Sequence, residues 1–287
     1  ALGAIKEYDG NVWRSIPTPT AWVLALATSA DGRVWYAAND DLGVVEAGPD
    51  GRRRCRSLLD QVPAAAKPLG QVWFCKARAD GVYWSASTSV LRRRDGVLRV
   101  WTFPEGSDLT LLDTGKALHL AVKGDALYRL DGETWTPISR DERVARYLLG
   151  LFDGWEGKGL MGIDGRGAGW TIAADGAVSE ALPALAPEDV GVAVSHAIIL
   201  RDGRLALATK GRGLLIRTAD GGIDQRFGLD GGTSSVSMLN LFQDREDGLW
   251  IGSKFGVTRV DLDRGITVHD ERTGAPSNIG LGTERHD

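Results

Sequence analysis

The side-chain types that most often carry catalysis or bind metals are few in this chain and lie far apart. Its 287 residues include two cysteines and four histidines, which are Cys55, Cys75, His119, His196, His269 and His286. No two of them have the spacing of a zinc or metalloprotease motif. The run 269–271 (His-Asp-Glu) holds three potential ligands, but neighbouring residues of a strand point to opposite faces and do not converge easily on one ion. We therefore predict no catalytic residues, no metal site and no cofactor.

Basic residues form the more informative group, because they recur at one place in neighbouring repeats of the sequence. They occupy four consecutive turns and are Lys123, Arg166, Lys210, Arg212 and Lys254. An arginine can hold a carboxylate or phosphate through two parallel hydrogen bonds, and gathered cations attract anions. We predict that these residues bind a small anionic ligand or a glycan. The alternative is that they are ordinary solvated loop charge.

The elements that must position these residues follow a repeated pattern of short apolar runs and turns. The clearest copy covers 236–278, where Asp247-Gly248 is followed by the apolar run Leu249–Gly252. Weaker copies lie upstream, so that the anchors of the pattern are Asp31, Asp80, Gly115, Gly157, Asp202 and Asp247. Successive anchors are about 35 to 49 residues apart, close to the ~40–50 residues of a propeller blade.

Each repeat contains four short strands, named A to D here in chain order. Asp-Gly suits the A–B turn, because glycine tolerates a positive φ and aspartate can bond the local backbone. One four-stranded sheet cannot bury both of its faces alone, whereas radially stacked sheets bury them against each other. Trp35, Trp84 and Trp250 are then expected to fill the space between blades. Helical turns are expected only in 57–67 and 181–189, both between strands D and A.

In such an arrangement the B–C turns share one face with the D–A loops, around the mouth of a central channel. All the basic residues named above fall in B–C turns of the third to sixth repeats, whereas 39–41 of the first repeat carries two acids. His196 lies on the predicted inner strand A of the fifth repeat, where it can face the channel. We include it among the candidate ligand-binding residues. The alternative is a hydrogen-bonded channel or core histidine.

The whole pattern predicts an all-β fold, a β-propeller of four-stranded blades that forms one domain over residues 1–287. Six repeats are complete, and Leu2–Ile16 matches strands C and D of a further blade that is split or incomplete. We therefore expect seven blades rather than six, either closed by strands from both ends or excised from a longer chain. A net charge of −4 gives no basic excess for nucleic acid. No apolar run approaches the ~20 residues that span a bilayer.

The last repeat carries a family resemblance. Residues 243–253 read QDREDGLWIGS, and they are followed by Phe255–Val257 and by the exit Gly274–Asn278. These residues closely resemble the two-component regulator propeller repeat; the match is fair at Asp31 and Asp202 and weak in the third and fourth repeats. The resemblance implies a non-enzymatic sensor propeller in the periplasm of a bacterial signalling protein. It also implies a neighbouring signalling domain or second propeller as partner, with no membrane segment inside this chain.

Two other classes of function remain open. The segment from Ile16–Pro19 to Trp35 has a general likeness to streptogramin lyases, although the glycine-rich blade exits of that family and a paired histidine and glutamate are missing. A protein-interaction disc is the third class, because propellers host all of these functions. Cys55 falls on an outer strand and Cys75 on the inner strand of the next blade. We expect two unpaired thiols, with a blade-to-blade disulfide as the alternative.

Overall fold

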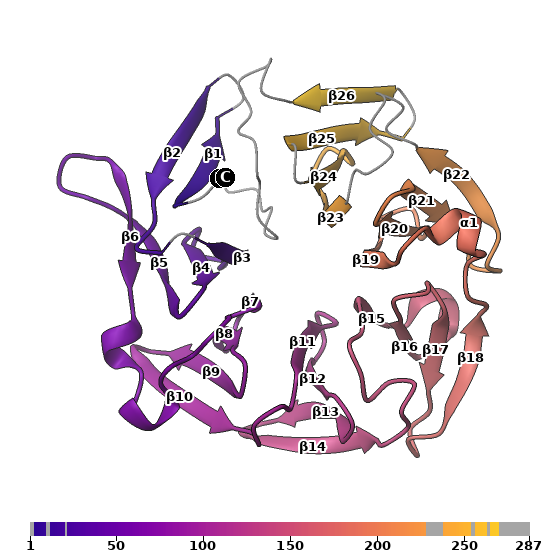
Figure 1. Cartoon of the computed structure of the whole chain (residues 1–287), viewed down its shortest axis with the longest axis horizontal. Coiled ribbons are helices and arrows are strands. Elements are labelled where there is room, and N and C mark those ends of the chain that lie inside the picture. The colour runs from indigo at the N-terminus through magenta and orange to yellow at the C-terminus, as the bar shows by residue number, and fades with distance from the viewer. Residues whose placement is uncertain are drawn as a thin grey trace. The chain divides into compact units, whose positions relative to one another are not determined.

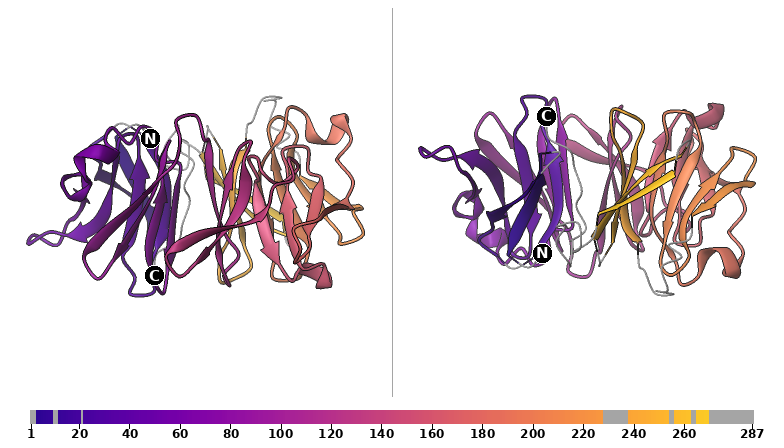
Figure 2. Two further views of the ribbon diagram at one scale, coloured as in Figure 1. Left: turned by 90° about the horizontal axis from the view of Figure 1, so that it is seen from below. Right: turned by 90° about the horizontal axis from the view of Figure 1, so that it is seen from above.

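The computed structural model describes residues 3–9, 12–20, 22–227, 238–253, 256–262 and 265–269. These residues form antiparallel sheets that are strongly twisted when seen from the side (Figure 2). Six sheets have four strands and one has two, and within each four-stranded sheet the strands are hydrogen-bonded in chain order. The predicted all-β propeller of four-stranded blades is therefore confirmed. The chain divides into two compact units, which are described in turn.

Unit 1 comprises residues 1–109, 255–257 and 268–287 and holds the two-stranded sheet with the first two blades (Figure 1). The two-stranded sheet consists of β1 (Ala4–Tyr8) and β2 (Trp13–Pro17). The strands of blade 1 are β3 (Val23–Thr28), β4 (Val34–Ala38), β5 (Asp41–Ala47) and β6 (Arg53–Ser57). Those of blade 2 are β7 (Phe74–Arg78), β8 (Gly81–Ser85), β9 (Ser89–Arg94) and β10 (Val97–Thr102).

Unit 2 comprises residues 110–254 and 258–267 and contains most of the other four sheets. Blade 3 consists of β11 (Leu109–Asp113), β12 (Leu118–Val122), β13 (Ala126–Asp131) and β14 (Thr134–Ser139). Blade 4 consists of β15 (Gly150–Asp153), β16 (Leu160–Ile163), β17 (Gly169–Ile172) and β18 (Val178–Leu182). Blade 5 consists of β19 (Val194–Ile199), β20 (Leu205–Thr209), β21 (Gly213–Arg217) and β22 (Ile223–Phe227). Blade 6 consists of β23 (Met238–Gln243), β24 (Leu249–Ser253), β25 (Gly256–Asp261) and β26 (Gly265–His269).

Many of these strands are connected by tight four-residue turns, in which the fourth residue has a positive φ angle. In the A–B turn of blade 1, Gly32 has φ +79° and donates its N–H to the carbonyl of Ser29 at 2.8 Å. In the A–B turn of blade 6 the left-handed residue is Asp247 (φ +64°) and not the expected Gly248. Asp247 donates its N–H to the carbonyl of Asp244 at 3.2 Å, so the same hydrogen-bonded turn forms one residue earlier than predicted.

Large apolar side chains fill the space between blades, as the sequence predicted for two of the three tryptophans. Trp35 and Trp84 are buried in one cluster of unit 1, and their rings meet edge to face with centroids 5.9 Å apart. Trp84 also donates its indole N–H to the carbonyl of Tyr36 in the neighbouring blade at 3.0 Å. Trp250 differs from the prediction, because it is only half-buried.

Helical structure is confined to short turns within the described residues. The 3₁₀ turns Leu59–Gln61 and Ala64–Ala66 and the single turn α1 (Pro187–Val190) lie in the two D–A loops where they were predicted. A further 3₁₀ turn, Trp155–Gly157, lies in the A–B loop of blade 4 and was not predicted. No helix in the described part of the chain is long and apolar enough to cross a membrane.

Candidate functional site

The B–C turns carry the predicted ligand-binding cations, and in unit 2 hydrogen bonds tie these turns to the D–A loops. Gly124, in the B–C turn of blade 3, donates its N–H to the carbonyl of Ala145 at 3.1 Å. Lys210, in the B–C turn of blade 5, donates its N–H to the carbonyl of Ala193 at 2.8 Å. B–C turns and D–A loops of unit 2 therefore lie on one face, as predicted.

Four of the five predicted cations have exposed side chains in these turns. Lys123 follows β12, Arg166 lies between β16 and β17, and Lys210 and Arg212 lie between β20 and β21. Blades 3, 4 and 5 pack against one another through shared apolar clusters, so the three turns are neighbours. We call these four residues the basic arc. Lys254 lies outside the described residues.

A buried carboxylate fixes the backbone of the turn that carries Arg166. Oδ1 of Asp164 accepts the N–H of Arg166 at 2.8 Å and that of Ala168 at 3.1 Å. Oδ2 of the same residue accepts the indole N–H of Trp170 at 3.3 Å. Leu185, from the next D–A loop, donates its N–H to the carbonyl of Arg166 at 3.0 Å. The main chain is thus held on both sides, while the guanidinium side chain is exposed.

A buried threonine plays the corresponding part in the turn of blade 5. Oγ1 of Thr209 accepts the N–H of Arg212 at 3.2 Å and donates to the carbonyl of Gly213 at 2.8 Å. Val192, from the preceding D–A loop, donates its N–H to the carbonyl of Lys210 at 3.1 Å. Both cations are therefore presented from a fixed backbone.

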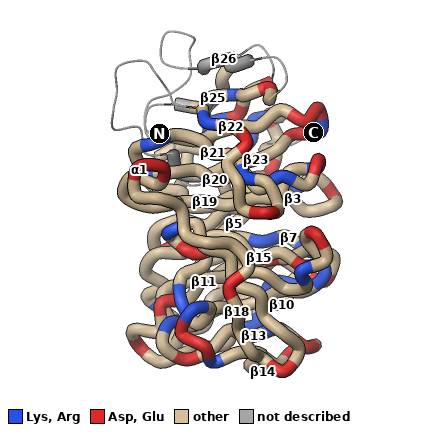
Figure 3. Tube along the Cα trace, turned by 90° about the vertical axis from the view of Figure 1, so that its right-hand side faces the viewer, with Lys and Arg blue, Asp and Glu red and all other residues tan. Residues whose placement is uncertain are grey.

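An acid in the same set of turns is already paired with another cation. Asp125 follows Lys123 by two residues, and its Oδ1 accepts from Nη1 of Arg140 at 2.6 Å. Asp125 also accepts a hydrogen bond from the hydroxyl of Tyr128. The hydrogen bond from Tyr128 and the neighbouring Arg140 hold the pKa of Asp125 below its usual range. Along the described part of the trace, Lys and Arg are interspersed with Asp and Glu (Figure 3).

His196 is half-buried on β19, and its role in the structure is to join two inner strands. Its Nδ1 accepts the N–H of Leu241, on β23 of the next blade, at 3.0 Å. A neutral imidazole that accepts at Nδ1 carries its hydrogen at Nε2. This contact matches the alternative given above, a hydrogen-bonded channel or core histidine. The ligand-binding role of His196 stays a prediction.

The structure adds residues to this face that the sequence reasoning missed. Arg146 and Tyr147 follow directly after Ala145, the residue that accepts from the turn of Lys123. Tyr147 is 51% exposed and Val192, beside the turn of Lys210, is 83% exposed. The only sequence signal for Tyr147 and Val192 was that each is a large apolar residue within a D–A loop. Exposed apolar side chains therefore lie beside the turns of Lys123 and Lys210 on this face of unit 2.

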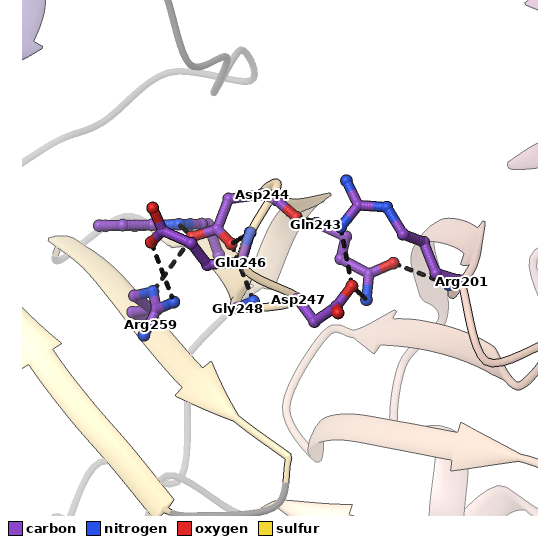
Figure 4. A network of polar contacts seen from close by, with 8 residues as sticks. Arg201, Gln243, Asp244, Glu246, Asp247, Gly248 and Arg259 are labelled. Carbon is purple, nitrogen blue, oxygen red and sulfur yellow. Dashed lines mark hydrogen bonds and ion pairs between the residues drawn. The ribbon is translucent and has the colours of Figure 1, made fainter. Parts of the chain in front are cut away.

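A polar network surrounds the A–B turn of blade 6, at the end of the sheet opposite to the B–C turns (Figure 4). Asp244 is buried, and its Oδ1 accepts the N–H groups of Glu246 at 2.9 Å and Gly248 at 2.8 Å. Its Oδ2 accepts the indole N–H of Trp250 at 2.7 Å and Nε of Arg259 at 3.1 Å. Burial raises the pKa of Asp244, but these hydrogen bonds outweigh it and hold the pKa below its usual range.

The same network joins blade 6 to blade 5. Nη1 of Arg201, in the A–B turn of blade 5, donates to the carbonyl of Asp244 at 2.6 Å and to Oδ1 of Asp247 at 2.7 Å. The N–H of Arg201 donates to Oε1 of Gln243 at 2.9 Å (Figure 4). These contacts occupy the polar groups of the two turns, so we assign this end of blades 5 and 6 a structural role.

Among the described residues there is no group of three or more metal-ligating side chains. His119 is buried on β12, and desolvation lowers its pKa to about 4. No disulfide joins Cys55 and Cys75. Cys75 is buried, and burial raises the pKa of the half-buried Cys55 to about 12. The side chain of His269 and the residues 270–271 lie outside the described part of the chain.

Solved structures share this fold over nearly the whole chain. The extracellular domain of the putative hybrid two-component system BT4673 from B. thetaiotaomicron is similar with a TM-score of 0.70 and 14% identity, over 98% of this chain and 37% of that one. The corresponding domain of BT3049 is similar with a TM-score of 0.65 and 12% identity, over 96% of this chain and 37% of that one. Our chain thus spans little more than a third of these domains.

Virginiamycin B lyase from Staphylococcus aureus is also similar, with a TM-score of 0.64 and 13% identity over 87% of this chain and 84% of that one. No protein-family model and no curated protein matches the sequence. The similarities therefore establish the fold class, a β-propeller that also occurs in extracellular domains of two-component systems and in a lyase.

Proposed function

We propose that this propeller is an extracytoplasmic ligand-binding domain of a bacterial signalling protein, without catalytic activity of its own. Its ligand is a small anion or an acidic glycan that binds at the basic arc. The periplasmic location and a neighbouring signalling domain or second propeller as partner follow from the sequence resemblance to regulator propellers. Their support from structure is the fold shared with extracellular domains of two-component systems.

The observation that carries the proposal is the way in which the cations of the basic arc are presented. Each lies in a B–C turn whose backbone is hydrogen-bonded to a neighbouring loop or to a buried side chain. The acids of these turns are engaged elsewhere, since Asp164 is buried under its own turn and Asp125 pairs with Arg140. Because the backbone of each turn is already fixed, the ordering cost of binding an anion is limited to the Lys and Arg side chains themselves.

A propeller lyase is the second candidate, and the likeness to virginiamycin B lyase is the observation that favours it. Against it, His196 is engaged with the backbone of Leu241, and burial lowers the pKa of His119. Nδ1 of His196 is therefore not available as a base, and His119 is buried away from solvent.

Calorimetry against matched ligands tests the proposal. The panel contains oligogalacturonate and its methyl-esterified form of equal length, which has the same linkages but no charge, together with inorganic sulfate. We expect the acidic oligosaccharide to bind and the affinity to fall as salt rises, because salt screens exposed charges. Binding that ignores the carboxylates of the ligand, or no binding of any acidic member, would contradict the proposal. Turnover of a ligand during the titration would favour the lyase.

A further inference from the structure

Two exposed tryptophans mark a second surface, which lies in unit 1 and does not involve the basic arc. Trp22 is 60% exposed and immediately precedes β3, the inner strand of blade 1. Trp73 is 39% exposed and immediately precedes β7, the inner strand of blade 2. The two residues therefore occupy the same position in consecutive blades.

Main-chain hydrogen bonds hold these two positions close to each other. Asn39, in the B–C turn of blade 1, donates its N–H to the carbonyl of Trp22 at 3.0 Å. Asn39 also forms a β-bridge with Gln71, which precedes Trp73 by two residues. Trp73 in turn donates its N–H to the carbonyl of Ser85 at 3.0 Å. The main chain at both tryptophans is thus fixed next to a single bridge.

The fold does not require an aromatic residue at this position. The residues that immediately precede the inner strands of the next three blades are Asp108, Leu149 and Ala193. An exposed indole contributes little to packing and leaves a large apolar ring in contact with water. Two of them at equivalent places, beside one bridge, indicate a binding surface.

The side chains around the two indoles favour a ligand with hydroxyl groups. Asn39 and Gln71 are exposed and supply amide groups, which can both donate and accept hydrogen bonds. Asp40 is exposed with a left-handed backbone (φ +53°), and its Oδ1 accepts the N–H of Leu69 at 2.8 Å, which fixes the carboxylate. A sugar ring has an apolar C–H face that stacks on indole, and hydroxyl groups at its edge that such side chains can bond.

We propose that Trp22 and Trp73 form a stacking platform for the pyranose rings of a neutral oligosaccharide, with Asn39 and Gln71 as hydrogen-bonding partners at its edge. The platform uses none of the residues of the basic arc. It therefore stands or fails independently of the anion site, and it adds a second subsite to the chain.

The test titrates the purified chain with cellohexaose, maltohexaose and xylohexaose, followed by calorimetry and tryptophan fluorescence. The variants are Trp22→Ala, Trp73→Ala and the conservative pair Trp22→Phe and Trp73→Phe, with Tyr147→Ala as an exposed aromatic control in unit 2. We expect one hexasaccharide to bind, each alanine variant to weaken it by about tenfold or more, and the phenylalanine variants to recover most of the loss.

The control and the charge variants separate this site from the anion site. Tyr147→Ala and the pair Lys210→Glu with Arg212→Glu should leave binding of the neutral sugar unchanged, and every variant should melt within a few degrees of the wild type. Failure of all three hexasaccharides to bind, or equal binding by the alanine variants, would overturn the platform. A change in tryptophan fluorescence on adding choline, absent in the Trp22→Ala and Trp73→Ala variants and seen with none of the sugars, would likewise overturn it in favour of a cation site.

Discussion

Trp250 donates its indole N–H to Oδ2 of Asp244 at 2.7 Å, six residues earlier in the chain. The same spacing joins Trp170 to Asp164 at 3.3 Å, in a B–C turn instead of an A–B turn. In both cases the other carboxylate oxygen accepts the N–H groups two and four residues further on. Trp35 makes the equivalent bond to Oγ of Ser29 at 2.9 Å. Three turns of this chain are therefore closed in the same way, by a side-chain oxygen that accepts the indole N–H of a tryptophan six residues further on.

The first prediction concerns Asp244. Asp244→Ala should destabilise the protein by about 3 kcal/mol, because it leaves the indole of Trp250, the guanidinium of Arg259 and two N–H groups without their shared acceptor. Urea unfolding of this variant, with Asp60→Ala at an exposed position as control, measures the difference. A loss equal to that of the control would mean that Asp244 does not hold the turn.

Asp244 should also make stability depend on acid pH. Its pKa is lower in the folded chain than the ordinary value, so its contribution is fully present above about pH 4, the unfolded value. That contribution is lost as pH falls through the lower folded value. Unfolding measured from pH 6 to pH 2 should therefore show a smaller acid-induced loss in Asp244→Ala than in the wild type. Parallel curves would contradict the assignment.

The tryptophans give a second prediction, about packing. Trp84→Ala should cost about 3–5 kcal/mol, because it removes a fully buried ring that contacts Trp35. Trp250→Ala should cost less, about 1–2 kcal/mol, because Trp250 is half-buried and loses mainly its bond to Asp244. Denaturant melts of the two variants side by side make the comparison. A larger loss for Trp250→Ala than for Trp84→Ala would show that Trp250 contributes more to packing between blades than Trp84 does.

His119 provides the third prediction. Burial lowers its folded pKa to about 4, below the ordinary value of about 6.5. Below pH 6.5 the unfolded chain binds a proton that the folded chain does not, so the free energy of unfolding falls until the pH reaches about 4. His119→Leu should flatten the stability curve between these two values. An unchanged slope would mean that His119 becomes protonated in the folded chain as readily as in the unfolded one.

The repeats revealed the fold because four apolar runs and their turns recur along the whole chain, even in the degenerate third and fourth copies. They also located the B–C turns of Lys123 and Arg166 correctly, since each follows a regular strand. The Asp247-Gly248 turn was placed one residue off, because Asp and Gly both adopt a left-handed backbone and only the bonds of Asp244 decide between them. The exposure of Trp22 and Trp73 could not be predicted from the sequence, because a tryptophan next to an apolar strand is usually buried.

The central claim is that the basic arc binds acidic ligands, and charge reversal tests it most directly. The variant combines Lys210→Glu with Arg212→Glu, and the control combines Arg52→Glu with Lys67→Glu, two exposed cations of unit 1 that give the same change in net charge. Calorimetry with oligogalacturonate at low and at 0.15 M salt measures both against wild type. We predict that the arc variant loses binding by at least about a hundredfold while the control stays within about threefold. Equal loss in both variants, or undiminished binding by the arc variant, would contradict the account.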